Sequence, residues 1–341
     1  MSKKKQATFV VFMVMLLLVC FTACGGNEKE ETSLTSETET SEPEKVIKIG
    51  ILQLVEHPAL DAAREGFIEA LKESGYEDGK NIKIDLQNAQ GDVTNAQTIA
   101  RKFADEKVDI IFAIATPAAQ AAANVTKEIP ILITAVTDPV SAGLAQSLEK
   151  PGGNVTGTTD MNPVADQIKL VKELVPNAEK VGILYNAGEI NSQIQVDIAK
   201  ETAKELGITI VEATVSNSSE VNQAAQSLVG RVDAIYVPTD NTIVSAIGAV
   251  IKVANDNKIP VIGSESGQVE AGAIATKGID YKDLGKQTGR VAVEVINGKK
   301  PQDIPIKGSE NISLIINQKA ADAIGLTIPK ELLDKADQVI K

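Results

Sequence analysis

Between residues 46 and 136, short runs of apolar residues alternate with longer segments whose apolar positions recur with a helical period. The short runs predict strands, and the longer segments predict helices. Strands are expected at 46–54, 81–89, 108–116 and 130–136, and helices at 60–75, 95–107 and 117–127. Strands separated by helices of this length indicate βαβ units and a parallel sheet. The strands are almost wholly apolar, which is typical of a sheet covered on both faces.

The same order of segments returns later in the chain. Three later strand segments each resemble an earlier one, and they come in the same order. The pairs are VGILYN (181–186) with IGILQL (49–54), RVDAIYVPTDN (231–241) with KVDIIFAIATP (107–117), and KIPVIGSES (258–266) with EIPILITAV (128–136). The repeat predicts two similar, doubly wound α/β lobes.

The segments after residue 272 form a third, partial set that is too short to be a domain. We expect this set to complete the first two lobes, so that the chain crosses between them several times and forms a hinge. The predicted first lobe contains residues 46–155 plus 278–304, and the second contains 156–277 plus 305–341.

The N-terminus has the features of an export signal. Lysines at positions 3–5 precede an apolar stretch that ends at Cys24, which is the order found in a secretory signal peptide. The residues Phe21-Thr22-Ala23-Cys24 resemble the lipobox of bacterial lipoproteins, in which the cysteine is lipidated. We therefore predict a signal peptide at 1–23 and a flexible, polar linker at 24–45. The protein would be extracytoplasmic and attached to the membrane by lipid on Cys24; an uncleaved anchor is the alternative.

The amino-acid composition argues against several classes of ligand and of catalytic group. The formal net charge of −12 argues against nucleic acid, because phosphate binding needs clustered Lys and Arg. His57 is the single histidine, and lipidation of Cys24 would leave no free thiol. We therefore expect no Cys/His metal site, no cysteine nucleophile and no cofactor. His57 between Glu56 and Asp61 suggests a catalytic base, but no Gly-x-Ser-x-Gly elbow accompanies it.

Polar residues of two kinds follow the predicted strands, at the edge where open α/β sheets bind ligands. Hydroxyls and N–H groups at helix starts suit a carboxylate, and these belong to Thr116, Ala118, Thr137, Asn191 and Ser192. Carboxylates suit an ammonium group, and these belong to Asp138, Glu189, Asp240 and Glu265. A zwitterionic amino acid carries both partners. The alternative for each residue is a helix cap, a role that Asn241 and Asp138 would suit in any α/β protein.

Four further residues lie at or near these strand ends. Tyr185 ends a strand and either contacts the ligand or packs in the core, whereas Tyr236 is mid-strand and favours the core. Asn241 belongs to the same strand-end turn as Asp240 and is included among the ligand contacts. His57 lies in the first strand-to-helix turn, where it would shape the pocket or hydrogen-bond the ligand.

Five spaced motifs resemble a known family: VEHPALD, VTDPVSAGLAQSLEKPGGNVTG, ILYNAGEINS, VPTDN and AIATKGIDYKDLGKQTG. They look like those of bacterial ABC-transporter substrate-binding lipoproteins associated with tryptophan and other aromatic amino acids. The resemblance implies the type I periplasmic-binding-protein fold with a three-crossing hinge. It also implies that Glu265 meets the ligand ammonium and that Thr116 and Thr137 meet its carboxylate.

The leading hypothesis is therefore a non-enzymatic, monomeric binding protein that traps a small ligand, an amino acid, between two lobes. An ABC permease and its ATPase would be its partners. Two alternatives remain. One is an exported α/β hydrolase that uses His57 or a carboxylate pair such as Asp138 with Asp240. The other is a ligand-sensing lipoprotein of the same fold that works without a permease.

Overall fold

The computed structural model describes residues 46–309 and 311–341. The predicted signal peptide, the predicted lipidation site Cys24 and the linker lie outside these residues. Within the described ranges, no helix combines the length and the apolar character needed to cross a membrane.

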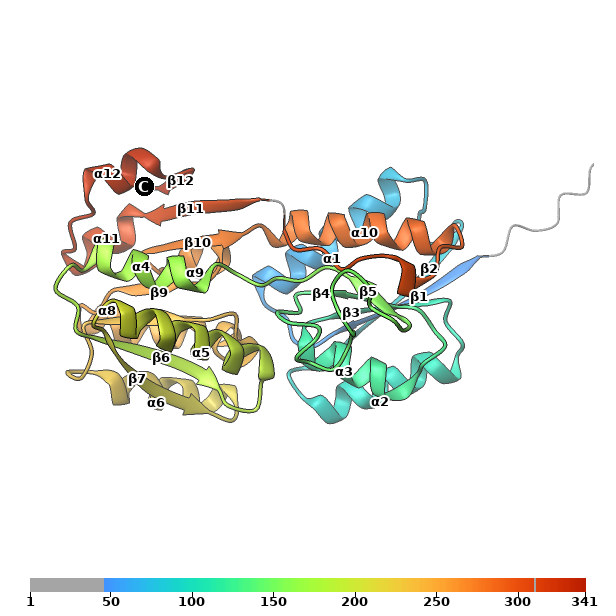
Figure 1. The fold of residues 1–341 in the computed structure, drawn as a ribbon, viewed down its shortest axis with the longest axis horizontal. Coiled ribbons are helices and arrows are strands. Elements are labelled where there is room, and N and C mark those ends of the chain that lie inside the picture. Colours follow the sequence, from blue (N-terminus) through green and yellow to red (C-terminus); the bar gives the residue numbers. More distant parts are fainter. Residues whose placement is uncertain (1–45, 310) are drawn as a thin grey trace, which may run out of the picture. The chain divides into compact units, whose positions relative to one another are not determined.

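The first lobe is built on a parallel sheet of five strands in the order β2-β1-β3-β4-β5. The strands are β1 (Ile47–Gln53), β2 (Ile82–Asn88), β3 (Ile110–Ile114), β4 (Ile131–Thr134) and β5 (Val155–Gly157). Its helices are α1 (Pro58–Glu73), α2 (Val93–Asp105), α3 (Thr116–Val125) and α10 (Tyr281–Ile296), with a 3-10 turn η2 (Pro301–Asp303). The pair α1 and α10 covers one face of the sheet, and α2 with α3 covers the other (Figure 1).

The second lobe is built on a sheet in the order β12-β11-β10-β9-β8-β6-β7, in which only the pairing of β10 with β11 is antiparallel, so β11 and β12 run opposite to the other strands. Its strands are β6 (Lys180–Asn186), β7 (Thr209–Val215), β8 (Ala234–Val237), β9 (Val261–Gly263), β10 (Ala275–Ile279), β11 (Ile312–Asn317) and β12 (Gln338–Ile340). Its helices are α4 (Val164–Leu174), α5 (Ile190–Glu205), α6 (Val221–Leu228), α7 (Asn241–Ser245), α8 (Ile247–Asp256), α9 (Ser266–Glu270), α11 (Gln318–Ile324) and α12 (Lys330–Lys335), with a 3-10 turn η1 (Ser218–Glu220). The predicted fold, two parallel-sheet α/β lobes, is confirmed.

The chain passes between the two sheets after β5, after β10 and after η2. The first and third of these segments pair with each other through a bridge between Thr158 and Lys307. The lobe boundaries predicted after residue 155 and before residue 278 fall within β5 and β10, each of which belongs wholly to one sheet. The precise residue division into lobes stays a prediction.

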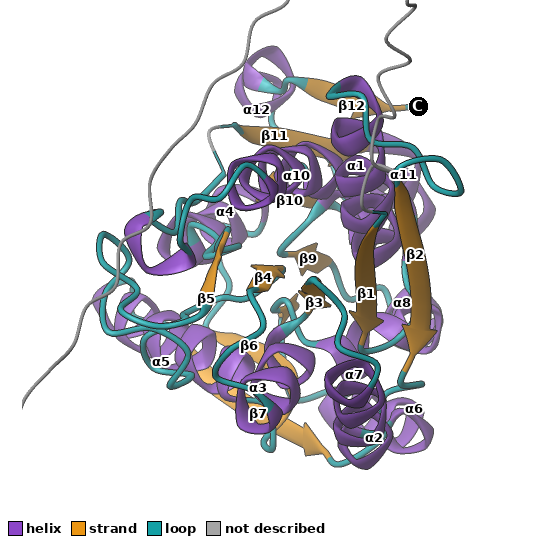
Figure 2. Cartoon of the chain, turned by 90° about the vertical axis from the view of Figure 1, so that its right-hand side faces the viewer, coloured by secondary structure: helices purple, strands orange, loops and turns teal. Residues whose placement is uncertain are grey.

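Helices α1 and α10 pack with their backbones in close contact, and Figures 1 and 2 both show them side by side. A Cβ atom at Gly285 would lie 1.9 Å from the carbonyl oxygen of Ala63, and one at Gly66 would lie 2.0 Å from that of Lys282. Only glycine permits this approach, because any side chain would overlap the facing backbone. The contact fixes the first residue of α10, Tyr281, relative to the first turn of α1.

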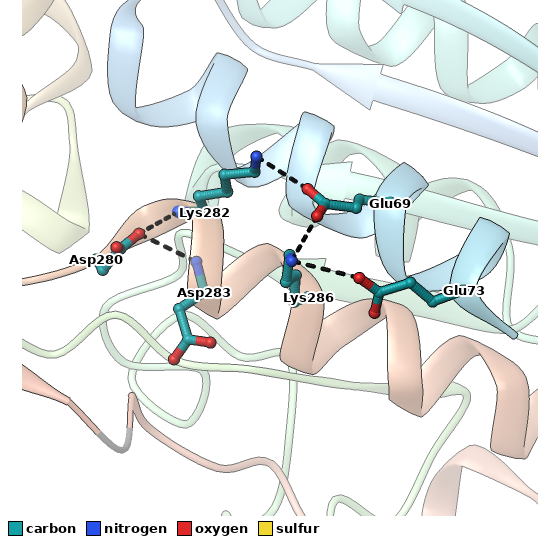
Figure 3. A network of polar contacts seen from close by, with 6 residues as sticks. All are labelled: Glu69, Glu73, Asp280, Lys282, Asp283 and Lys286. Atoms are coloured by element: carbon teal, nitrogen blue, oxygen red, sulfur yellow. Dashed lines mark hydrogen bonds and ion pairs between the residues drawn. The ribbon is translucent and has the colours of Figure 1, made fainter.

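Ion pairs cross the exposed side of the same helix pair (Figure 3). Glu69 of α1 binds Lys282 at 2.9 Å and Lys286 at 2.6 Å, and Lys286 also reaches Glu73 at 3.5 Å. The two ammonium groups lower the pKa of Glu69 to about 2. Exposed pairs such as these add little stability, so we expect the glycine contact to matter more.

The substitution Gly285→Ala tests this packing. The added Cβ must push the backbones of α1 and α10 apart, and we expect a loss of about 2 kcal/mol or more in the free energy of unfolding. Gly248 in α8 is the matched control, because a Cβ there would meet nothing within 4 Å. Gly248→Ala should leave stability unchanged or raise it by about 0.5–1 kcal/mol. Urea denaturation measures both, and equal effects would contradict the packing account.

Candidate functional site

A small cavity lies where the carboxyl ends of strands from both sheets meet. Residues from both lobes line it: His57, Ala59, Leu60, Ala135, Asp160, Asn191, Thr239, Asp240, Asn241, Val244, Glu265 and Tyr281. Its free volume is about 20 Å³, which is room for little more than one water molecule. A larger open groove of about 1010 Å³ borders it, also lined from both lobes, and shares Asn241 with it. Any ligand of amino-acid size must therefore move the walls of the cavity apart.

Asp160 and Tyr281 join two of the segments that connect the lobes. The Tyr281 hydroxyl donates to Asp160 Oδ2 at 2.6 Å, and the Thr137 hydroxyl donates to Oδ1 at 3.1 Å. Asp160 follows β5, and Tyr281 opens α10 directly after β10. Burial raises the pKa of Asp160 above its ordinary value, although both hydrogen bonds favour the charged form.

Glu265 and Asp240 occupy equivalent places at the ends of β9 and β8, where each caps a short helix. Glu265 accepts from the backbone N–H groups of Gly267 at 2.5 Å and Gln268 at 2.8 Å. Asp240 accepts from the N–H groups of Ile243 and Asn186 and from the hydroxyl of Ser192. Burial raises the pKa of each carboxyl to about 7, and the charge of Glu189 adds to the shift at Asp240.

The cavity is lined by acids and holds no cationic side chain among the described lining residues. Three of its lining residues are buried acids, and none of the described residues that line it is Lys or Arg. His57 does not supply the missing positive charge. Burial lowers its pKa to about 4, against smaller opposing effects of Asn241 and Asp61, so the imidazole is neutral at pH 7. This arrangement favours a cationic group in the cavity.

Several buried polar atoms at the site have no hydrogen-bond partner among the described residues. Around the cavity these are both ring nitrogens of His57, Oδ1 of Asn191 and Oγ1 of Thr239. Oγ1 of Thr116, the first residue of α3, is also buried without a partner. Buried polar atoms in native proteins are almost always paired with protein groups or ordered water, so these atoms require a partner such as a bound water or a ligand group.

The structure brings five of the predicted ligand residues to the cavity: His57, Asn191, Asp240, Asn241 and Glu265. Glu189 and Ser192 lie just behind them. Glu189 accepts hydrogen bonds from Asn191, Asn241 and Thr242, so it fixes the turns of the second lobe. Ser192 donates to Asp240 at 2.6 Å.

Other predicted ligand residues lie elsewhere. Asp138 accepts from the backbone of Val140 and Ser141 and does not line the cavity. Asp138 therefore stabilises a turn between β4 and β5, where the structure has no helix for it to cap. Tyr185 packs in the core of the second lobe, and its hydroxyl donates to Glu212 at 2.6 Å. Ala118 is fully buried in the core of the first lobe.

Sequence reasoning missed Asp160 and Tyr281. Asp160 follows β5, which has three residues and therefore no readable periodicity. The signal that could have found it is the acid in TGTTDMNP, just beyond the apolar Val155. Tyr281 opens the helix of residues 281–296, whose return to the first lobe was predicted, but local sequence did not show that this tyrosine would meet Asp160 at the cavity.

The comparisons with known proteins place the chain in a family. The family model described as ABC transporter substrate binding protein matches residues 48–340. The chain is 50% identical over 326 residues to a tyrosine-binding protein of Clostridioides difficile, covering 96% of this chain and 94% of that protein.

Two solved structures are also similar. The ABC domain of Streptococcus pneumoniae in complex with L-Trp is 40% identical with a TM-score of 0.84, covering 87% of this chain and 100% of that chain. The ligand-free, open structure of CD0873, a substrate-binding protein with adhesive properties from Clostridium difficile, is 51% identical with a TM-score of 0.66 and the same coverage. The chain belongs to the family of ABC transporter substrate-binding proteins.

Proposed function

We propose that this protein is the extracytoplasmic, lipid-anchored binding component of an ABC importer and that it traps an aromatic amino acid between its two lobes. The observation that carries the proposal is the cavity's set of buried carboxylates, Asp160, Asp240 and Glu265, with no Lys or Arg among the described lining residues. An α-ammonium group would supply the missing charge. Ala59, Leu60, Ala135 and Val244 give the cavity apolar walls for the ligand side chain.

The ligand carboxylate would bind at the start of α3. Thr116 Oγ1 is buried without a partner at the N-terminus of this helix, which spans Thr116–Val125. Free N–H groups and the helix dipole favour an anion at such a position. The named relatives support an aromatic side chain, because one is a tyrosine-binding protein and another binds L-Trp.

The conformation fits a closed state. The sequence identity of the chain is higher to the ligand-free, open CD0873 than to the protein of the L-Trp complex. The structural similarity is nevertheless greater to the L-Trp complex, with a TM-score of 0.84 against 0.66. A cavity of about 20 Å³ cannot admit an amino acid without opening. Ligand binding would therefore shift an equilibrium between open and closed lobes, and the closed form would dock on the permease.

The proposal also includes the attachment of the protein to the membrane and its oligomeric state. Lipid on Cys24 would hold the protein at the membrane, residues 24–45 would act as a spacer, and the protein would be a monomer. The protein would not be an enzyme. A catalytic base needs a nucleophile within hydrogen-bond reach, and neither nitrogen of His57 has a hydrogen-bond partner among the described residues.

The substitution Glu265→Gln tests the ammonium site. Removing this charge should weaken L-tyrosine or L-tryptophan binding by about 30-fold or more, since losing one partner of a buried charge pair costs about 2 kcal/mol or more. Glu270→Gln, a nearby exposed acid, is the control and should bind normally. Titration calorimetry measures both affinities. Unchanged affinity in Glu265→Gln would remove Glu265 from the site.

The raised pKa values predict how stability without ligand changes with pH. Burial raises the pKa of both Asp240 and Glu265 to about 7, so the folded state holds protons that the unfolded state has already released. The contribution of these two carboxyl groups to the free energy of unfolding is fully present below about pH 4, and it is lost as the pH rises through about 7. We expect the melting temperature without ligand to fall between pH 5 and pH 8. In the double variant Asp240→Asn/Glu265→Gln the fall should be smaller, and an identical slope would contradict the assignment.

A further inference from the structure

Four polar atoms around the cavity lack a partner among the described residues and were not assigned above to the ammonium or the carboxylate of the proposed ligand. They are both nitrogens of His57, Oδ1 of Asn191 and Oγ1 of Thr239. His57 belongs to the first lobe, whereas Asn191 and Thr239 belong to the second. All three residues line the same cavity. A ligand group between them would bond to both lobes at once.

Asn191 is held so that its free oxygen stays available. Its Nδ2 donates to Glu189 Oε2 and to the Thr239 carbonyl, both at 3.0 Å. Both bonds use the amide nitrogen, so Oδ1 is left as an acceptor with no donor. Asn191 is 3% exposed, so bulk water does not serve this oxygen.

Thr239 and His57 complete the set. The backbone of Thr239 is anchored because its N–H donates to Gln195 Oε1 at 3.1 Å, and its hydroxyl is left unpaired. His57 is 8% exposed and lies beside Asn241 of the second lobe, and Asn241 belongs to the same strand-end turn as Thr239. A neutral imidazole offers one donor and one acceptor, and a hydroxyl offers both. The set is therefore matched to a polar group that can donate a hydrogen bond.

We propose that the site requires a hydrogen-bond donor on the ligand side chain and that His57, Asn191 and Thr239 recognise it. The inference rests on the proposed amino-acid ligand and adds a selection among aromatic side chains. The phenol of tyrosine and the indole N–H of tryptophan both supply the donor, whereas phenylalanine has none. A ligand without the donor leaves buried polar atoms unpaired, and sites built to bond a polar group reject such analogues strongly.

The test is titration calorimetry of the full chain with L-tyrosine, L-tryptophan and L-phenylalanine. We expect phenylalanine to bind at least about 30-fold more weakly than the better of the other two. If phenylalanine binds as tightly, the inference is wrong and the proposed function stands. If none of the three binds, the proposed function fails, and the inference fails with it.

Single substitutions test which residues select the ligand side chain. Thr239→Val keeps the side-chain volume and removes the hydroxyl, and His57→Leu removes both nitrogens. In each variant, the ratio of the Kd of phenylalanine to the Kd of the better ligand should fall by about tenfold, mainly because the better ligand binds more weakly. Thr276→Val is the matched control, because Thr276 Oγ1 is also buried without a partner but does not line the cavity. This variant should keep the wild-type preference.

Circular dichroism and melting temperature establish that each variant is folded. A preference that survives in folded Thr239→Val and His57→Leu, or that disappears in Thr276→Val, overturns the assignment. If a variant does not fold, the wild-type ratio of affinities still decides whether the donor is required.

Discussion

Carboxyl groups buried without a counter-charge raise the free energy of a folded protein, and this protein places three of them around one cavity. Local hydrogen bonds offset part of that cost. The hydroxyl of Tyr281 donates to Asp160, and backbone N–H groups donate to Asp240 and Glu265. The pKa values of all three groups nevertheless stay raised. A cationic ligand group would relieve the remaining cost, so ligand binding and lobe closure follow from the same electrostatic demand.

The first lobe holds its share of the site through one helix pair. Helices α1 and α10 belong to distant parts of the chain, and they meet through backbone contacts at Gly66 and Gly285. His57 immediately precedes α1, and Tyr281 is the first residue of α10. The pair therefore sets the distance between His57, which lines the cavity, and Tyr281 of the connecting segments. In the second lobe, hydrogen bonds between polar turns hold the residues of the cavity in place. Glu189 accepts hydrogen bonds from the side chains of Asn191 and Asn241.

The two-lobed fold and five of the residues that line the cavity could be predicted from the sequence, for a clear physical reason. Parallel strands end at one edge, so apolar runs followed by polar turns located His57, Asn191, Asp240 and Glu265 without any tertiary information. The same logic could not tell a ligand contact from a cap, and Asp138 proved to bond its own turn. Asp160 and Tyr281 were not predicted, because β5 is too short to show a pattern and the contact between these two residues depends on long-range packing.

The central claim is that the buried acids of the cavity, whose pKa values are raised without ligand, bind the cationic group of the ligand, and proton release on ligand binding tests it most directly. Titration calorimetry of L-tyrosine or L-tryptophan at pH 7, in two buffers of different ionisation enthalpy, counts the protons exchanged. Because the pKa values of Asp240 and Glu265 are about 7 without ligand, an ammonium group beside them should lower those pKa values, and binding should release protons. Tight binding with no proton exchange, or with proton uptake, would contradict the account.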